Sequence, residues 1–424
     1  MDIQRLKGFR DILPDETPVW QLVERIARGA FERYGYEEIR LPLVEETALF
    51  TRSIGEDTDI VEKEMYTFSD TGGTSVALRP EGTASAVRAY LENGLHRTDP
   101  KSRLYYLGPM FRRERPQKGR HRQFHQLGAE CFGWAEPSAD ADLLCLLSDF
   151  FSDLGLSERV NLELNSLGCL EDRARYREHI RARLSARKED LCENCRRRID
   201  TNPLRVLDCK SARCRQITEG LPPLPESLCP ECSEHFRQVL DLLDAQGLGY
   251  SLNPRMVRGL DYYNRTTFEL VSGGLGAQNA VAAGGRYDGL VEMLGGPAVP
   301  ALGFAVGVER LVLLLGDDAA SRPAPLAYVI HGSESSLREA LLIRRELLRT
   351  GVIADIDYEP RSLKAQLRAA DRRGARFALI LGEDEIASRT VTIKDMANGT
   401  QETVSRSEAV FRVVAQSSPP EKEG

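Results

Sequence analysis

FRRERPQKGRHRQFHQLG, residues 111–128, is the stretch of this 424-residue sequence that decides the fold. It holds six Lys or Arg side chains in one short, turn-prone segment. The apolar run LYYLG (104–108) comes before the basic segment, and the alternating run QFHQLGAECFG (123–133) comes after it. Both runs are typical of β-strands, so we predict an antiparallel hairpin with a basic tip. Such a hairpin can hold a nucleotide over its strands and a polyanion over its loop, although a solvated surface hairpin fits the same pattern.

Length and charge exclude several classes of protein. A chain of 424 residues can hold two or three domains with sizeable cores. Its net charge of −7 argues against a generally basic nucleic-acid coat, yet the stretch 173–215 carries 14 Lys or Arg against 6 Asp or Glu. The first residues lack the apolar core of a signal peptide, and no run is long enough to span a membrane. We therefore expect a cytoplasmic protein with reduced cysteines.

The remaining segments predict further units along the chain. Apolar residues at helical spacing predict a helix over 17–34, and the segment 36–44, with Pro42 inside it, is expected to be an edge strand. An Arg-rich, Cys-rich, helical pattern from about 170 to 234 indicates an insertion. Alternating strand-like and helical patterns predict a small α/β domain at 325–415, followed by a flexible tail at 416–424.

Four motifs together resemble the signature set of the histidyl-tRNA synthetases, a family of class II aminoacyl-tRNA synthetases. The motifs are FRRE (111–114), RGLDYY (258–263), GGRYDGL (284–290) and GFAVGVER (303–310). The resemblance covers nearly the whole chain, from KGFRDILP (7–14) to LGEDE (381–385). It implies an α/β (α+β) fold, in which an antiparallel-sheet catalytic core at 1–322 carries the helical insertion and the domain at 325–415 binds the anticodon.

The resemblance also implies an activity and partners. The family activates histidine with ATP to histidyl-adenylate and transfers the histidyl group to the 3′ end of tRNA(His). ATP is then a substrate, Mg²⁺ accompanies it, and the helix and strand near the N-terminus build a homodimer interface. The expected partners are tRNA(His), histidine, ATP and a second copy of the chain, with no membrane.

Activation places a carboxylate against the α-phosphate of ATP, so the site must stabilise a crowded, negative transition state. Arginine suits this task because its planar guanidinium can donate two parallel hydrogen bonds to one oxyanion and because it keeps its charge. By resemblance, Arg112 clamps the α-phosphate, and Arg258 sits where other class II enzymes place a metal ion. Arg310 lies against the adenine and the γ-phosphate. Glu114 and Phe124 complete the expected ATP site, with Phe124 stacked on the adenine.

A histidine pocket needs polar partners for the ring nitrogens and a counter-charge for the α-ammonium. The resemblance assigns three residues to the α-amino group: Glu81, Thr83 and Gln126. Glu130 lies four residues after Gln126 on a predicted strand, so it shares that face and is expected at the imidazole. Tyr262 and Tyr263 would face opposite sides of an extended segment, and the resemblance nominates Tyr263 for the ring, with Tyr262 nearby. The alternative for this pair is core packing.

Glycines in two motifs are expected to allow close approach of backbone. The pair Gly284 and Gly285 would let the chain come near the substrate. Gly303 and Gly307 lie four residues apart, and a helical interpretation would put both on one face against the ATP-bearing strands.

Contacts to tRNA are expected at two places. The resemblance places Arg115 and Gln117, in the basic hairpin loop, at the acceptor end. Lys364, Arg368 and Arg372 repeat every four residues and form a basic ridge on a predicted helix. Such a ridge is either solvated charge or, in an anticodon-binding domain, a contact to tRNA phosphates.

Six of the nine cysteines lie in the insertion. Two Cys-x-x-Cys knuckles, Cys192 with Cys195 and Cys229 with Cys232, flank Cys209 and Cys214, and this spacing is compatible with a tetrahedral structural zinc. The resemblance does not require zinc, so reduced thiols that pack a small helical insertion remain the alternative.

Two rival functions share much of the pattern. One is a regulatory, synthetase-like subunit of an ATP phosphoribosyltransferase, which binds histidine without charging tRNA. Such proteins typically lack the anticodon-binding domain and have degraded motifs, whereas FRRE, Arg258 and GVER are intact here. The other is a class II enzyme for another amino acid, which RGLDYY and GGRYDGL disfavour.

Overall fold

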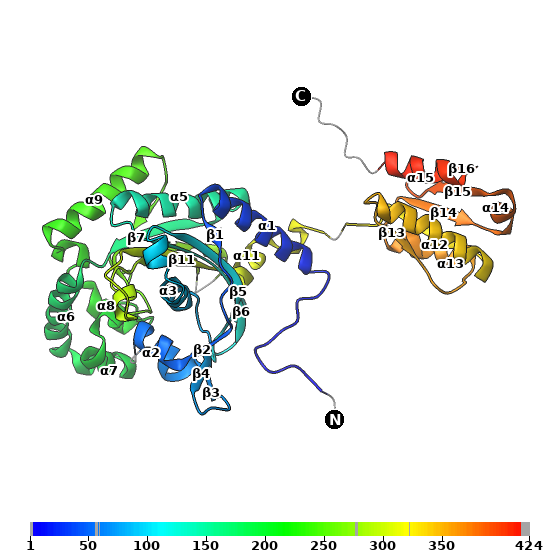
Figure 1. The fold of residues 1–424 in the computed structure, drawn as a ribbon. Helices are drawn as coiled ribbons and strands as arrows, with labels where there is room; N and C mark the ends of the chain where they lie inside the picture. The colour runs from blue at the N-terminus through cyan, green and yellow to red at the C-terminus, as the bar shows by residue number, and fades with distance from the viewer. Residues whose placement is uncertain (1–2, 56–57, 59, 276–278, 322, 417–424) are drawn as a thin grey trace. The chain divides into compact units, whose positions relative to one another are not determined.

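The computed structural model describes residues 3–55, 58, 60–275, 279–321 and 323–416. The chain forms two compact units, Met1–Ser321 and Arg322–Gly424, and each is considered by itself (Figure 1). Of the tail predicted at 416–424, only Gln416 lies among the described residues.

An eight-stranded sheet organises the first unit. Its strands, in spatial order, are β1 (Glu37–Glu38), β5 (Arg103–Phe111), β6 (Gln123–Phe132), β11 (Ala301–Gly307), β10 (Ala280–Arg286), β9 (Asn264–Val271), β7 (Asn161–Ser166) and β8 (Ser251–Leu252). Only the two edge strands pair in parallel with their neighbours, and all inner pairs are antiparallel. The predicted antiparallel core is therefore confirmed.

The basic hairpin forms as the sequence predicts. Strands β5 and β6 pair in antiparallel register from Arg103 opposite Cys131 to Phe111 opposite Gln123. The residues between them, 112–122, form the loop, in which Gln117 and Arg120 make an isolated bridge. The loop therefore projects its basic residues beyond the end of the paired strands.

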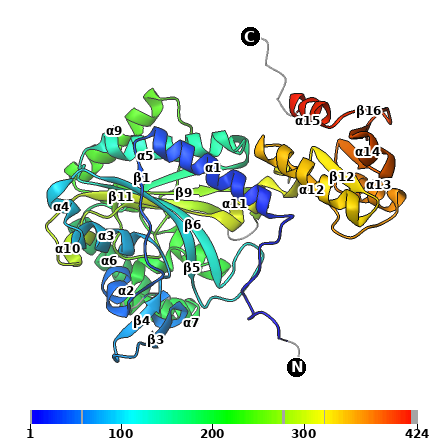
Figure 2. The same cartoon turned by 45° about the vertical axis from the view of Figure 1, so that its right-hand side comes forward.

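Helices cover both faces of this sheet, because each face carries an apolar layer (Figures 1 and 2). One core joins the sheet to α1 (Thr17–Arg33), α5 (Pro137–Asp153), α9 (Pro230–Ala245) and α11 (Val308–Leu315). A second core on the other face joins it to α3 (Thr83–Glu92), α6 (Leu170–Ser185) and α10 (Leu290–Met293). Outside the insertion, the first unit also contains the α-helices α2 (Thr47–Ile54) and α4 (Leu95–Thr98).

The N-terminal helix is confirmed as α1, but the single strand predicted over 36–44 is wrong. Only β1 pairs at the edge of the large sheet, while β2 (Val44–Glu46) joins a separate sheet with β4 (Ser75–Leu78) and β3 (Tyr66–Ser69). Between them, the carbonyl oxygens of Leu41 and Pro42 accept from Nη1 of Arg79 at 2.9 and 3.3 Å. A buried arginine therefore takes the place of a neighbouring strand.

The insertion is helical, as predicted, and comprises α6, α7 (Glu193–Thr201), α8 (Ala212–Glu219) and the start of α9. Its two cysteine knuckles do not share a site. Cys192 and Cys195 meet Cys209 and Cys214, whereas Cys229 and Cys232 meet Cys169 and Asp172. The single zinc site considered from the spacing is thus replaced by two separate groups, because the two knuckles lie at different places in the insertion.

The second unit is a small α/β domain. Its sheet has the order β13 (Ala354–Ile356), β12 (Ala327–His331), β14 (Phe377–Leu381), β15 (Thr390–Asp395) and β16 (Gln401–Ser405). Its helices are α12 (Glu334–Arg349), α13 (Leu363–Arg372), α14 (Glu383–Ser388) and α15 (Arg406–Ala415). Lys364, Arg368 and Arg372 on α13 are exposed, as expected for the basic ridge. No described helix in either unit is long and apolar enough to cross a membrane.

Candidate active site

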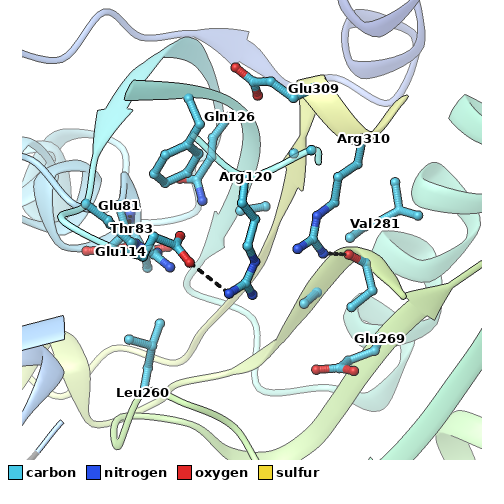
Figure 3. A pocket seen from close by; sticks show the side chains of 18 of the residues that line it. Glu81, Thr83, Glu114, Arg120, Gln126, Leu260, Glu269, Val281, Glu309 and Arg310 are labelled. Atoms are coloured by element: carbon cyan, nitrogen blue, oxygen red, sulfur yellow. Dashed lines mark hydrogen bonds and ion pairs between the residues drawn. The ribbon is translucent and has the colours of Figure 1, made fainter. Parts of the chain in front are cut away.

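A cavity of about 250 Å³ lies over strands β6, β9, β10 and β11, between the hairpin loop and the turn at 258–263 (Figure 3). Ten predicted site residues line it: Glu81, Thr83, Arg112, Glu114, Phe124, Gln126, Arg258, Tyr262, Tyr263 and Arg310. Three predicted residues, Glu130, Arg115 and Gln117, are not among those that line it. The fold thus gathers residues up to 229 positions apart in the sequence around one space.

Glu81 and Thr83 form one side of the cavity (Figure 3). The carboxylate of Glu81 accepts the backbone N–H groups of Thr83 at 2.7 Å and Ala84 at 2.9 Å, in the first turn of α3. Burial raises the pKa of Glu81, although these two amides oppose the rise. The helix end therefore fixes a carboxylate against the cavity, where it can neutralise a cationic group.

Glu130 lies behind this wall and is completely buried. It accepts hydrogen bonds from Oγ1 of Thr83 at 2.7 Å, from the hydroxyl of Tyr106 at 3.0 Å, and from the hydroxyl of Tyr287. Burial raises the pKa of Glu130 to about 8, although the bonds from Tyr287 and Thr83 lower it. A carboxylate offers about four acceptor positions, and three hydroxyl donors occupy part of that capacity here. Its role at the imidazole stays a prediction.

The glycines of two motifs pack against protein. Gly303 lies opposite Glu130 on β11, so the helical interpretation of Gly303 and Gly307 is wrong. A Cβ at Gly284 would lie 2.3 Å from the carbonyl oxygen of Gly303, and one at Gly285 would lie 2.6 Å from that of Thr266. Both glycines are thus needed for close packing between strands, and neither is among the residues that line the cavity.

Gly303→Ala is expected to lower the free energy of unfolding by about 1–3 kcal/mol, since the added Cβ overpacks the site. That Cβ would lie 1.9 Å from Oε2 of Glu130 and 2.5 Å from the carbonyl oxygen of Ala129. Gly307→Ala on the same strand is the matched control, because its nearest neighbour, Cδ of Arg310, lies 3.8 Å away. Chemical denaturation measures both, and equal losses would contradict the packing argument.

Both tyrosines of RGLDYY line the cavity, with ring centroids 4.6 Å apart. The expectation that they face opposite sides is wrong because Tyr262 lies in a turn and not in an extended strand. Three buried polar atoms around the cavity have no hydrogen-bond partner among the described residues: the Tyr262 hydroxyl, Oε1 of Gln126 and Nε of Arg258. Buried polar atoms are rarely left unpaired, so these three indicate a polar ligand.

Arginines occupy the rest of the cavity. Nε of Arg112 donates to the carbonyl oxygen of Pro80 at 2.9 Å, and its guanidinium lies 5.3 Å from the ring of Phe124. Arg120 and Arg310 both point into the space (Figure 3). Burial, and then the positive charge of Arg120, lower the pKa of Arg310. Crowded like charges of this kind favour the binding of a polyanion.

Arg258 is held at the cavity wall by two neighbours. It forms an ion pair with Glu269 on β9, and its guanidinium lies 5.2 Å from the ring of Tyr263. Burial, the largest single influence, opposes its charge, but Glu269 together with Tyr263 and Tyr262 outweighs it, so the pKa of Arg258 is raised. One edge of the guanidinium is thus anchored, while Nε has no hydrogen-bond partner among the residues that the structure describes.

Sequence reasoning missed three charged residues that line the cavity. Arg120 pairs with Glu114 at 2.8 Å, Glu269 holds Arg258, and Glu309 accepts the backbone N–H of His125 at 3.0 Å. The signal for Glu269 was available, since it is the lone charge in the strand-like run TTFELV. Arg120 stood among six basic residues of the hairpin, and nothing in the pattern separated it from the others.

Comparisons with known proteins agree over both units. The sequence model of the histidyl-tRNA synthetase family matches residues 8–311, and that of an anticodon binding domain matches residues 326–416. A histidine–tRNA ligase of Trichlorobacter lovleyi is 54% identical over 95% of this chain and 96% of its own length. Another, from Geobacter metallireducens, is 54% identical over 95% and 97%.

A solved structure agrees with these relatives. The apo histidyl-tRNA synthetase of S. aureus has a TM-score of 0.82 and 33% identity, with 97% of this chain and all of that chain covered. The matches reach across the catalytic core and the second unit together. The chain therefore belongs to the histidyl-tRNA synthetase family.

Proposed function

We propose that the cavity is where histidine and ATP react to form histidyl-adenylate, with histidine on the Glu81 side and the phosphates of ATP among the arginines. The overall reaction, ATP-dependent ligation of histidine to tRNA(His), is that of the family to which the chain belongs. The observation that carries the proposal is that one space is lined both by Glu81, a buried carboxylate held at the start of α3, and by four arginines, Arg112, Arg120, Arg258 and Arg310.

Histidine is held by groups that match each of its ends. Glu81, Thr83 and Gln126 surround the α-ammonium, where a fixed carboxylate and an unpartnered amide oxygen are complementary to a cation. Glu130 accepts from an imidazole nitrogen, and Tyr263, with Tyr262 beside it, packs against the ring. This set favours a side chain that carries a ring N–H.

ATP lies across the arginines with its α-phosphate between Arg112 and Arg258. Both arginines also approach the carboxylate of histidine, so they neutralise the two anions that must meet. Arg310 binds the γ-phosphate end, while Phe124 stacks on the adenine and Glu114 completes the nucleotide site. Mg²⁺ would accompany ATP and would neutralise part of the charge on its phosphates. No protein nucleophile is required, since the histidine carboxylate itself attacks the α-phosphate, the bond between the α- and β-phosphates breaks, and pyrophosphate leaves.

Transfer to tRNA uses surfaces outside this cavity. Arg115 and Gln117, in the hairpin loop, contact the acceptor end, and the second unit binds the anticodon through the ridge on α13. Two copies of the chain form the active enzyme, with α1 and the strand that follows it at the interface. The enzyme acts in the cytoplasm, where its tRNA is found.

Histidine-dependent exchange of pyrophosphate into ATP, followed by charging of bulk tRNA, tests the proposal. Both activities are expected. Exchange without charging would instead support a regulatory relative, and exchange that depends on another amino acid would overturn the choice of histidine. Sedimentation of the purified protein tests the dimer.

At about pH 9, where Glu130 with its pKa of about 8 is mostly ionised, Glu130→Gln is expected to weaken histidine binding by about 1.5–3 kcal/mol, because a charged acceptor is replaced by an amide, while ATP binding barely changes. Since the pKa of Glu130 is about 8, the difference between wild type and variant should widen as the pH rises from about 7 to about 9. Calorimetry with a non-hydrolysable ATP analogue present measures this difference.

Tyr263→Phe serves as the comparison for Glu130→Gln. It should cause a smaller loss, and the double variant should be non-additive if both side chains touch one ring. Unchanged histidine affinity in Glu130→Gln at both pH values would remove this residue from the pocket.

A further inference from the structure

We propose that Cys192, Cys195, Cys209 and Cys214 bind one structural Zn²⁺ in the insertion. Their four sulfur atoms all lie within 4.8 Å of one another, and those of Cys192 and Cys209 are 3.8 Å apart. A tetrahedral zinc with Zn–S bonds of about 2.3 Å separates its sulfurs by about 3.8 Å. The thiols are therefore already spaced as a four-sulfur zinc site requires.

The ligands come from separate segments that only the fold brings together. Cys192 caps the N-terminus of α7 and Cys195 lies in its first turn, while Cys209 and Cys214 flank the start of α8. The backbone N–H of Cys192 donates to Sγ of Cys214 at 3.3 Å. Amide donation to sulfur stabilises a thiolate, as the outer shell of a metal site does. Cys195 and Cys214 are completely buried, so a bound ion would be shielded from solvent on that side.

A metal would also add to a small apolar cluster. The cluster around the four thiols has four buried aliphatic side chains, Leu184, Leu191, Ile199 and Val206, although α6 also packs into the second core of the sheet. Small apolar clusters of this kind are often supplemented by a metal or by disulfides. A disulfide would draw a pair of sulfurs to about 2.05 Å, whereas the four thiols are free and the sulfurs of Cys192 and Cys209 lie 3.8 Å apart. Thiolate ligands select zinc over the hard cations Ca²⁺ and Mg²⁺.

A second group of side chains in the insertion is also arranged to bind a metal ion. Cys169, Asp172, Cys229 and Cys232 place their ligand atoms within 4.8 Å of one another. Cys169 caps α6 and Cys229 caps α9, so this group ties the two ends of the insertion where they leave the core. The backbone N–H groups of Asp172 and Cys232 donate to Sγ of Cys169 at 3.5 Å and of Cys229 at 3.4 Å. The carboxylate of Asp172 is oriented by the N–H of Cys229 at 2.9 Å. A metal bound by the Cys169 group would hold the base of the insertion together, and a metal bound by the Cys192 group would hold its far part together.

The first site lies at the wall of a cavity that it shares with arginines of the active site. Cys192 and Cys209 line a second cavity, of about 900 Å³, whose other walls include Arg112, Arg120 and Arg310 of the active site. Loss of the ion would therefore loosen a wall opposite the arginines that we assign to ATP.

Zinc content of the full-length protein tests the inference. The chain is expressed in zinc-supplemented medium, purified without chelator, and analysed by native mass spectrometry and elemental analysis. Two equivalents per chain are expected. Cys209→Ser should remove one and Cys229→Ser the other, while Cys145→Ser should keep both. Cys145 lies outside the two groups, and its thiol donates only to Gln246, a bond that serine can make.

Each outcome decides the matter for one site. One equivalent that is lost in Cys209→Ser supports the first site and overturns the second, and one that is lost in Cys229→Ser does the reverse. No bound zinc, or a mass lowered by two hydrogens for each disulfide, overturns both. If a serine variant fails to fold, Co²⁺ substitution of the wild type still discriminates, because a thiolate-bound cobalt gives intense charge-transfer absorption and an empty site gives none.

Discussion

Arg258→Ala is expected to slow histidyl-adenylate formation by about 100-fold or more while histidine affinity changes little. Arg258 lines the cavity and is held by Glu269 and Tyr263, and its buried Nε has no hydrogen-bond partner among the described residues. A donor placed in this way acts mainly on charge that develops in the transition state, and it therefore supports turnover more than ground-state binding.

Histidine-dependent exchange of pyrophosphate into ATP measures the loss of rate, and calorimetry measures histidine binding. Arg258→Lys should recover only part of the rate, because an ammonium keeps the charge but loses the planar fork. Arg255→Ala is the matched control, since Arg255 lies in the same segment but does not line the cavity. A fall in histidine affinity with normal turnover would show that Arg258 serves binding and not chemistry.

Removal of the second unit, by truncation after Ser321, is expected to reduce tRNA charging by about 100-fold or more and to leave pyrophosphate exchange within about twofold. The two units are compact by themselves, so the core should remain folded. Binding one tRNA at two places raises its affinity by about 10²–10⁴ over either contact alone, and truncation loses that gain.

The two activities are measured on the same preparation, with sedimentation to confirm that the oligomeric state is unchanged. Replacing Lys364, Arg368 and Arg372 with glutamate in the full-length chain is the finer version of this experiment. It should weaken charging and reduce its salt dependence if the ridge contacts phosphates. Equal losses of exchange and charging in an intact core would show that the second unit supports the active site instead.

The sequence by itself determined the elements whose information is local. Period-two alternation around a polar loop was enough to predict the β5–β6 hairpin, and helical spacing was enough for α1. The resemblance to the histidyl-tRNA synthetases pointed to ten residues that line the cavity, because its short motifs can be matched to this sequence position by position.

Only the tertiary structure decided how distant segments meet. Arg79 takes the carbonyls of residues 41 and 42 that a strand would have paired, and the two knuckles of the insertion find different partners. Glu130 is surrounded by Thr83, Tyr106 and Tyr287, from three separate segments, and Gly303 leaves room for its carboxylate. Local periodicity specifies which way a side chain points along its own strand. The neighbours that it meets, and therefore its burial and its charge, are set by long-range packing.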